Sequence, residues 1–316
     1  MMNGKDNVGS VFALEGWLKF NQYKWGVTPL RLRLTEGDRE TLPAIETVLY
    51  LDKKGRIVQP PLNPYLPVIF YPTPTDKKPR VYRQWLNLSK LLVEEFIKRG
   101  VKGAIAFPPE VIDIRQWQWH GFLGEVRYTF YIDLPLNLDM VDSSARKEAN
   151  KAKKQGFICD VADKNAFSEV IACLEETGKR KKFSYMLTTK DLEVALDLLG
   201  EDVLRVYVCR NTSGEIVSAR VVLITPNLRA WGWVSGTKKH FLASGCAKFL
   251  IWYTLTDLSR LGIEKFDFCG ANLPTVSAAK ADWGGTLIPY YVIRPLNLRA
   301  VAGWLLKKLS QFRKRK

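Results

Sequence analysis

The C-terminal third of the chain contains a succession of strand and helix patterns that is compatible with few folds. Leu228–Ser235 alternates aromatic and small residues as a strand does, and Ser244–Leu261 has the apolar spacing of an amphipathic helix. Lys265–Cys269 is a short apolar strand, and Lys280 stands three residues before a Trp-Gly-Gly turn that leads into a last strand. This order predicts an α/β (α+β) domain in which helices flank a mixed, mostly antiparallel sheet.

Predicted helices and two further strands precede this region. In chain order these helices and strands cover 145–155, 164–177, 189–199, 203–210 and 215–225. With 316 residues the chain is long enough for two domains. We predict a first domain at 1–138, a second at 139–295 and a C-terminal helix at 296–316.

Positive charge is concentrated in three segments. The formal net charge is +16, and basic residues cluster in Arg146–Lys154, Lys179–Lys182 and Leu296–Lys316. Such clusters favour a polyanionic partner, namely nucleic acid, an anionic membrane surface or a phosphorylated substrate. The alternative is a solvated basic surface that has no specific partner.

Several classes of protein are disfavoured by what the sequence lacks. No run approaches 18 consecutive apolar residues, so no membrane-spanning helix is expected, and the polar first ten residues do not read as a signal peptide. The five cysteines have neither paired nor metal-like spacing, which indicates reduced thiols in a cytoplasmic protein. With two histidines in the chain, no metal site is expected.

The region from about 125 to 295 resembles the Fem-type branch of the GNAT superfamily. The resemblance rests on the Trp231-Gly-Trp233 strand, the following helix, the Phe266-Asp-Phe268 strand and the Lys280-Ala-Asp-Trp-Gly-Gly turn. Members of this branch transfer acyl or aminoacyl groups to amines. The resemblance implies two GNAT-like halves, each a mixed, mostly antiparallel sheet flanked by helices. The first half would be a degenerate copy and matches only in layout.

Lys280 and Asp267 are the candidate catalytic residues. A lysine in a Phe-Lys-x-x-Phe-Gly setting lies at the active cleft of Fem-type enzymes, so the resemblance implies that Lys280 contacts the acyl donor or stabilises developing negative charge. The sequence departs from that setting at Ala279, and the alternative is a surface lysine. Asp267 ends a strand, where it could orient Lys280, accept a proton, or cap the backbone at Gly270 and Ala271.

Five aromatic or basic residues are candidate substrate contacts. Trp231 and Trp233 alternate on one strand and share a face, where they line an acceptor channel or pack in the core. The resemblance places Arg180 where it could grip a phosphate or carboxylate, with Tyr185 nearby. Trp283, the aromatic residue of the Trp-Gly-Gly turn, completes this set.

The loop before the second-domain helix departs from that of enzymes that use acyl-coenzyme A. In those enzymes a glycine-rich loop and the helix N-terminus cradle pyrophosphate. Here Gly245 and the alanine two residues later match the pattern, and no basic residue stands three positions before Gly245. Lys238, Lys239, Ser244 and Gly245 are therefore the candidate donor- or anion-binding residues.

The C-terminal segment 296–316 has apolar residues on one predicted helix face, with Trp304 beside them and basic residues at its end. A basic amphipathic helix with tryptophan suits an anionic membrane interface. The same apolar face could instead pack on the first domain.

Together these features predict a cytoplasmic Fem-like transferase that forms an amide bond on an amine of a cell-envelope precursor, such as a lipid-linked muropeptide. No bound cofactor is expected, and the donor substrate is aminoacyl-tRNA or acyl-coenzyme A. One alternative is an acyl-coenzyme A-dependent N-acyltransferase that acts on an amino sugar or polysaccharide precursor. Another is a non-catalytic GNAT scaffold that binds a polyanion or a membrane. The C-terminal segment would allow peripheral contact with the inner face of the membrane.

Overall fold

The computed structural model describes residues 10–36, 42–225 and 229–296, which divide into two compact units. The first contains Trp25–Arg127 and the segment that begins at Tyr290, and the second contains Val8–Lys24 and Tyr128–Pro289. These units differ from the predicted ranges 1–138 and 139–295, because the N-terminal helix packs with the second unit and the chain returns to the first at Tyr290. The predicted helix at 296–316 lies outside the described residues, apart from Leu296.

The first unit is built on an antiparallel sheet. Its central strand β2 (Ala44–Leu51) pairs with β1 (Thr28–Thr35), β3 (Ile57–Val58) and β4 (Val68–Tyr71). The long helix α2 (Lys78–Arg99), the short strand β5 (Ile105–Ala106) and the short helix α3 (Arg115–Trp119) follow. Phe96 and Phe107 pack against Trp117 with ring centres 6.1 and 4.7 Å away, and these buried rings form part of the core of this unit.

The second unit contains a longer mixed sheet with the strand order β12-β6-β11-β10-β9-β8-β7. The strands are β6 (Phe122–Asp133), β7 (Ile158–Val161), β8 (Leu204–Arg210), β9 (Ile216–Thr225), β10 (Arg229–Thr237), β11 (Lys265–Asp267) and β12 (Thr286–Pro295). β11 runs parallel to β10, and the pairs from β10 to β7 are antiparallel. β6 and β12 each have residues in both units. The prediction of mixed, mostly antiparallel sheets flanked by helices is confirmed.

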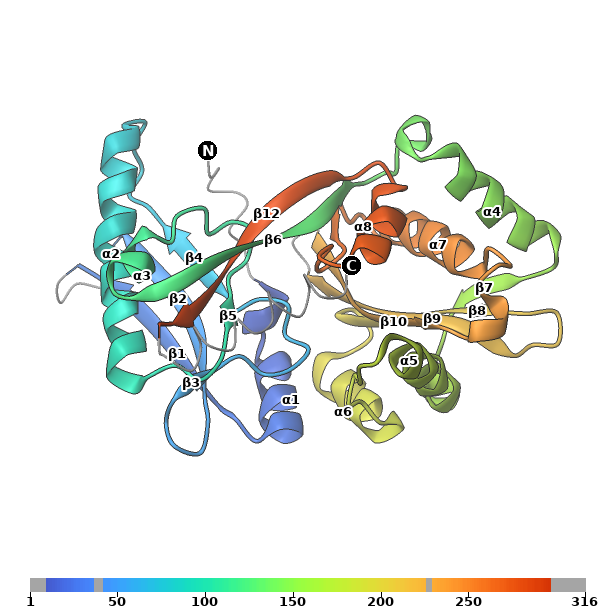
Figure 1. Ribbon diagram of the computed structural model, residues 1–316, viewed down its shortest axis with the longest axis horizontal. Coiled ribbons are helices and arrows are strands. Elements are labelled where there is room, and N and C mark those ends of the chain that lie inside the picture. Colours follow the sequence, from blue (N-terminus) through green and yellow to red (C-terminus); the bar gives the residue numbers. More distant parts are fainter. Residues whose placement is uncertain (1–9, 37–41, 226–228, 297–316) are drawn as a thin grey trace, which may run out of the picture. The chain divides into compact units, whose positions relative to one another are not determined.

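Helices cover both faces of the second sheet (Figure 1). On one face lie α4 (Ser143–Lys154), α7 (Cys246–Arg260) and α8 (Pro274–Ala281); on the other lie α5 (Phe167–Lys181), α6 (Thr189–Leu199) and α1 (Glu15–Trp25). Short 3₁₀ helices cover Val11–Ala13, Leu138–Met140, Lys164–Ala166 and Lys239–Phe241. Because helices cover both faces, the central strands are apolar on both sides. The sequence of β9 is therefore an almost continuous run of apolar residues.

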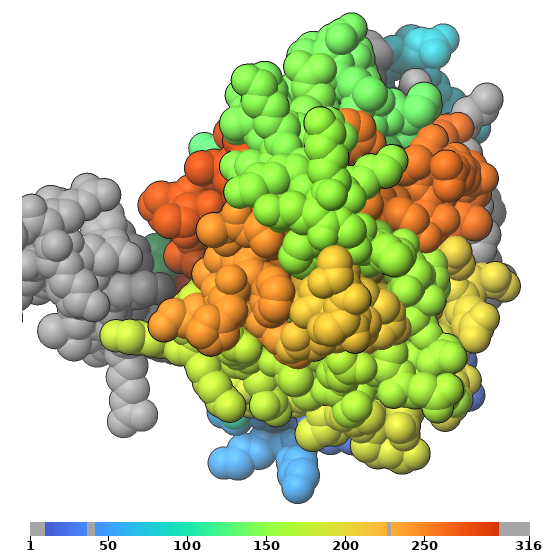
Figure 2. Space-filling view, turned by 90° about the vertical axis from the view of Figure 1, so that its right-hand side faces the viewer, coloured from blue at the N-terminus to red at the C-terminus, as the bar shows by residue number. Residues whose placement is uncertain are grey.

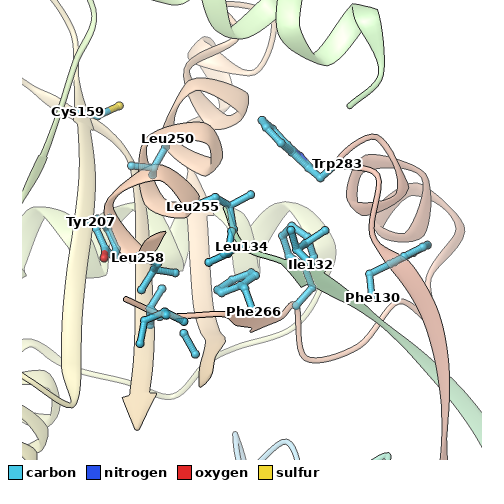
Figure 3. Packing of buried hydrophobic residues seen from close by; sticks show 14 of the residues in the cluster. Phe130, Ile132, Leu134, Cys159, Tyr207, Leu250, Leu255, Leu258, Phe266 and Trp283 are labelled. Atoms are coloured by element: carbon cyan, nitrogen blue, oxygen red, sulfur yellow. The ribbon is translucent and has the colours of Figure 1, made fainter. Parts of the chain in front are cut away.

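The core between the second sheet and α7 fixes the position of α8 (Figure 3). Leu250, Leu255 and Leu258 form the buried face of α7, and they pack in one cluster with Phe266 of β11 and with Trp283. Trp283 stands two residues after the end of α8, so its burial anchors the turn that carries Lys280. Among the described residues, no helix combines the length and apolar character needed to cross a bilayer.

The two glycines of the Trp-Gly-Gly turn are required by close backbone approach. Gly284 has φ = 70°, and a Cβ there would lie 2.5 Å from the carbonyl oxygen of Met140. A Cβ on Gly285 would lie 2.7 Å from the carbonyl oxygen of Tyr131. Side chains at these positions would therefore push the turn away from β6 and from the 3₁₀ helix Leu138–Met140.

Candidate active site

Strands β10 and β11 separate in the middle of the second sheet. They pair in parallel over three residues, the last pair being Trp231 and Asp267, where β11 ends. β10 continues beside β9 to Thr237, with a β-bulge between Gly232 and Val234 immediately after the last pair. A bulge leaves one residue outside the regular ladder and bends the strand. Side chains from several elements gather around this separation.

Lys280 stands in the last turn of α8, above the loop that follows β11. Its Nζ donates hydrogen bonds to the carbonyl oxygens of Phe268, at 2.7 Å, and Gly270, at 2.5 Å. An ammonium group has three donors, so one N–H of Lys280 has no acceptor among the described residues and could donate to a substrate. Burial lowers the pKa of Lys280 to about 8, and the charge of Arg220 acts in the same direction, against the raising effects of Cys269 and Asp267. Lys280 is therefore a partly desolvated cation near neutral pH.

Asp267 and Thr129 hold the loop that accepts hydrogen bonds from Lys280. The buried Oδ1 of Asp267 accepts a hydrogen bond from Thr129 Oγ1 at 2.5 Å and one from the Cys269 N–H at 2.7 Å. Thr129 Oγ1 in turn accepts from the Gly270 N–H at 2.9 Å. Asp267 therefore caps the loop backbone directly at Cys269 and, through Thr129, at Gly270, whereas the Ala271 N–H donates to the carbonyl oxygen of Tyr128. Asp267 also acts on Lys280 through its negative charge.

Arg220 of β9 is a candidate that the patterns of the sequence do not single out. Its Nε is enclosed and has no hydrogen-bond partner among the described residues, and the centre of its guanidinium lies 5.7 Å from the centre of the Phe268 ring. Lys280 Nζ lies 5.5 Å from the same ring. Burial lowers the pKa of Arg220 to about 10. Two desolvated cations thus lie beside one aromatic ring where β10 and β11 part.

The space for Arg220 is created by Gly232, the residue just before the bulge. A Cβ on Gly232 would lie 3.3 Å from Nη1 of Arg220 and 3.0 Å from Cζ of Phe266. A charged residue inside the apolar strand Ile216–Thr225 is the sequence signal that would identify Arg220. Burying a charge without a partner is unfavourable, so such a residue suggests a function.

Arg180 and Tyr185 lie at the end of β10, beyond its separation from β11. Arg180 donates to the carbonyl oxygen of Thr237 at 3.1 Å and to Thr177 Oγ1 at 3.3 Å, and the Tyr185 hydroxyl donates to the carbonyl oxygen of Ser235 at 2.9 Å. Burial raises the pKa of Tyr185, although Arg220 is close enough to oppose this shift. These side chains support the backbone of β10 and bring Tyr185 near Arg220.

The three candidate tryptophans are packed as core residues. Trp231 contacts Phe12, and Trp233 contacts Trp17 and Phe20 of α1, with ring centres 5.4–5.7 Å apart. All three tryptophans from the sequence prediction are buried. The structure thus favours the core alternative for Trp231 and Trp233 and makes Trp283 an anchor of the Lys280 turn.

The candidate donor-binding residues at the start of α7 have partners within the protein. Lys238 pairs with Glu215 at 2.7 Å, and the Lys239 N–H donates to Glu176 at 2.6 Å. Ser244 Oγ donates to the carbonyl oxygen of Phe241 and accepts from the Cys246 N–H. None of these contacts involves Lys280.

Gly245, the residue before α7, lies against the backbone of α4. Its φ is 84°, and a Cβ there would lie 2.2 Å from the carbonyl oxygen of Glu148. The helix end at which acyl-coenzyme A enzymes bind pyrophosphate is therefore closely approached by α4. Among the described residues no group of histidine, cysteine and acidic side chains is placed to hold a metal ion.

Gly245→Ala is expected to destabilise the second unit far more than Gly214→Ala. Both glycines have φ = 84°, but a Cβ on Gly214 would meet nothing within 4 Å. The left-handed backbone alone disfavours alanine by about 1–2 kcal/mol. The clash with Glu148 adds roughly 1–3 kcal/mol, as overpacking does. Urea unfolding of both variants measures the difference, and equal losses of stability would contradict the close approach of α4.

Comparison with known proteins identifies the second half of the chain. Residues 141–275 match the family model described as acetyltransferase (GNAT) domain. This match and the fold support an acyltransferase of the GNAT type. No curated protein matches the chain in sequence.

Solved structures extend the similarity over most of the chain. FemX is similar with a TM-score of 0.63 at 13% identity, covering 91% of this chain and 93% of FemX. The C-terminal domain of a putative lysylphosphatidylglycerol synthetase from Agrobacterium fabrum gives 0.58 at 13% identity, covering 83% and 84% of the two chains. L-PGS from Bacillus licheniformis gives 0.56 at 14% identity, covering 90% and 89%. The resemblance to the Fem-type branch is thus confirmed as a likeness of fold.

Proposed function

We propose that the protein transfers an acyl or aminoacyl group to an amine of a cell-envelope precursor at the separation of β10 and β11. The observation that carries this proposal is the convergence of Lys280 and Arg220 on the Phe268 ring. Attack on a carbonyl produces a negatively charged oxygen. Fixed cations in a buried site stabilise such charge more strongly than solvent does.

The reaction requires a neutral amine and a polarised carbonyl. The amine nitrogen attacks the carbonyl carbon, and the carbonyl oxygen becomes an oxyanion beside Lys280 and Arg220. Collapse of this intermediate breaks the bond to the leaving oxygen or sulfur, which receives a proton from the Lys280 ammonium. Water accepts the proton that the amine nitrogen releases and returns one to Lys280. Positioning of the two substrates supplies much of the remaining rate.

The donor that we favour is aminoacyl-tRNA. The contact of Gly245 with the Glu148 carbonyl disfavours a pyrophosphate at the start of α7, and Glu215 offsets the charge of Lys238. The match of 141–275 to an acetyltransferase model supports acyl-coenzyme A as the second donor. The fold similarities to FemX and to L-PGS support an acceptor in the cell envelope.

Single-turnover transfer from two donors tests the proposal. A labelled pool of aminoacyl-tRNA and a set of labelled acyl-coenzyme A thioesters are each offered with a membrane-extracted precursor lipid. We expect precursor-dependent loss of label from aminoacyl-tRNA. The product should survive mild alkali as an amide does, whereas an alkali-labile product would identify an ester to a lipid hydroxyl. Absence of transfer from every donor would leave the non-catalytic scaffold as the better description.

The rate is expected to fall as pH rises through about 8. The amine acceptor must first lose its proton, so kcat/KM rises with pH at the low end. Above about 8 Lys280 loses its own proton, because its pKa is lowered to that value, and the site loses one of its cations. A pH profile of kcat/KM measures this falling limb. Lys280→Arg should lack it, since arginine stays charged, and an unchanged limb in that variant would assign it to another group.

A further inference from the structure

We propose that the exposed face of α4 is a docking surface for the phosphate backbone of an RNA donor. This inference rests on the proposed transferase function and identifies where its donor binds. Ala145, Ala149 and Ala152 are the buried residues of α4. Lys147, Lys151 and Lys154 repeat at intervals of four and three residues, so they share the opposite, solvent-exposed face. Figure 2 shows α4 in green, exposed on this side of the second unit.

The charge on this face is not neutralised within the described parts of the chain. Lys147, Lys151 and Lys154 make no ion pair with the described residues, whereas Glu148, the acid of α4, is engaged by Lys248 at 3.2 Å. At about 1.5 Å of rise per residue, the three lysines follow one another at steps of about 4.5–6 Å along the helix axis. A row of unpaired cations of this kind suits successive phosphates of one nucleic-acid strand.

Arg146 adds a second type of anion-binding group at the beginning of the helix. It lies in the first turn of α4 and is half-buried, and its enclosed Nε has no hydrogen-bond partner among the described residues. A guanidinium can bind one phosphate through two hydrogen bonds. The polyanion would therefore be held most firmly at the end of α4 that begins at Ser143.

This end of α4 is joined to the turn that carries Lys280. The Asp142 N–H donates to the carbonyl oxygen of Asp282 at 2.8 Å. Lys248 lies between Glu148 and Asp282, at 3.2 Å from each carboxylate. Since Asp282 is two residues from Lys280, an RNA strand that ends near Arg146 brings its 3′-terminal acyl ester towards the candidate catalytic cation.

The composition of α4 favours RNA over a membrane as the partner. Its sequence, SSARKEANKAKK, contains no large apolar side chain. Helices that lie on membranes place aromatic or large aliphatic side chains in the lipid in addition to their charges. A helix with small buried residues and a cationic outer face binds a polyanion without insertion.

Neutralising the row of lysines tests this docking surface. The variant K147Q/K151Q/K154Q is compared with the control variant K19Q/K164Q/K190Q. The control removes three exposed lysines from α1, α6 and the 3₁₀ helix Lys164–Ala166, which leads directly into α5; α1, α5 and α6 lie on the opposite face of the sheet. Total uncharged tRNA is the binding probe. We expect the α4 variant to bind it at least about tenfold more weakly at low salt. The slope of log affinity against log salt should fall by about 2–3, because each lysine neutralises about one phosphate. The control variant should change little.

A short donor separates docking from chemistry. Single-turnover transfer from a pool of aminoacyl-tRNA should slow in the α4 variant, whereas transfer from aminoacylated CCA trinucleotides should not change. Equal losses of tRNA binding in both triple variants would overturn the inference, as would loss of transfer from the trinucleotides. Loss of binding to phosphatidylglycerol vesicles with unchanged tRNA binding would assign α4 to the membrane instead.

The outcomes distinguish this inference from the proposed function. If acyl-coenzyme A is a donor and both triple variants bind tRNA equally well, the proposed transferase function is supported and the docking surface is contradicted. If tRNA binding depends on α4 but no donor supports transfer, the docking surface is supported and the proposed transferase function is contradicted.

Discussion

Lys280→Ala is expected to reduce kcat by about 10²–10³-fold, the loss that follows removal of one donor to a developing oxyanion. The ammonium of Lys280 donates two hydrogen bonds, to the carbonyl oxygens of Phe268 and Gly270. Neither of these bonds uses its third N–H. Alanine removes both the charge and the proton that the leaving group receives. Burial already disfavours the charged form of Lys280, as its lowered pKa indicates, so its loss should not unfold the protein.

Two further variants make the Lys280 result interpretable. Lys190→Ala removes an exposed lysine of α6 from the same unit and should leave kcat unchanged. Lys280→Arg keeps the charge, but a planar guanidinium cannot reproduce the two hydrogen bonds of the ammonium, so its kcat should lie between those of the wild type and Lys280→Ala. Thermal unfolding shows whether each variant is folded. A folded Lys280→Ala protein with wild-type kcat would exclude the catalytic assignment of Lys280.

Local patterns in the sequence are enough to predict the fold class and the position of Lys280. The alternation in β10, the helical spacing of α7 and the Trp-Gly-Gly turn each follow from short-range chemistry, and they occur in the order that places a lysine beside the end of a strand. The family resemblance supplies the role that we propose for that lysine. No single-sequence pattern shows that Trp283 is the buried anchor of the turn, because its neighbours Leu250 and Leu255 come from another helix.

The parts of the site that sequence does not reveal depend on contacts between distant segments. Thr129 and Asp267 are 138 residues apart, and their hydrogen bond fixes the loop that holds Lys280. Trp231 and Trp233 alternate as a channel lining would, yet their partners are Phe12, Trp17 and Phe20 near the other end of the chain. Alternation of residue types along a strand identifies the side chains that share one face, but it does not show which other segment covers that face.

Arg220→Met is expected to stabilise the protein and to reduce its activity. Arg220 lies in the middle of an apolar strand with an enclosed Nε that has no partner among the described residues. Replacing buried charge with an apolar side chain of similar length is often stabilising by about 1–4 kcal/mol. The same change removes one of the two cations that face the developing oxyanion, so kcat should fall by about 10–100-fold. Gains in stability that accompany losses of activity are characteristic of functional sites.

Arg205→Met is the matched control for the stability effect. Arg205 lies on the neighbouring strand β8, where its Nε pairs with Asp257 at 3.0 Å, and the Tyr207 hydroxyl donates to the same carboxylate at 2.9 Å. Methionine at 205 leaves Asp257 without its cation, so this variant should lose stability. Urea unfolding of the two variants should therefore give changes of opposite sign. A loss of stability in Arg220→Met would show that the guanidinium is satisfied in the fold.

The pH profile of Arg220→Met then tests whether Arg220 and Lys280 act on the same site. The charge of Arg220 contributes to the lowered pKa of Lys280, and its removal should raise that pKa. The falling limb of kcat/KM should consequently move from about 8 to higher pH, while the rising limb, which belongs to the acceptor amine, should stay in place. A second variant, Arg220→Lys, restores a cation and should move the falling limb back towards its wild-type position. A falling limb that is unaffected by both substitutions would separate the two residues and restrict the role of Arg220 to structure.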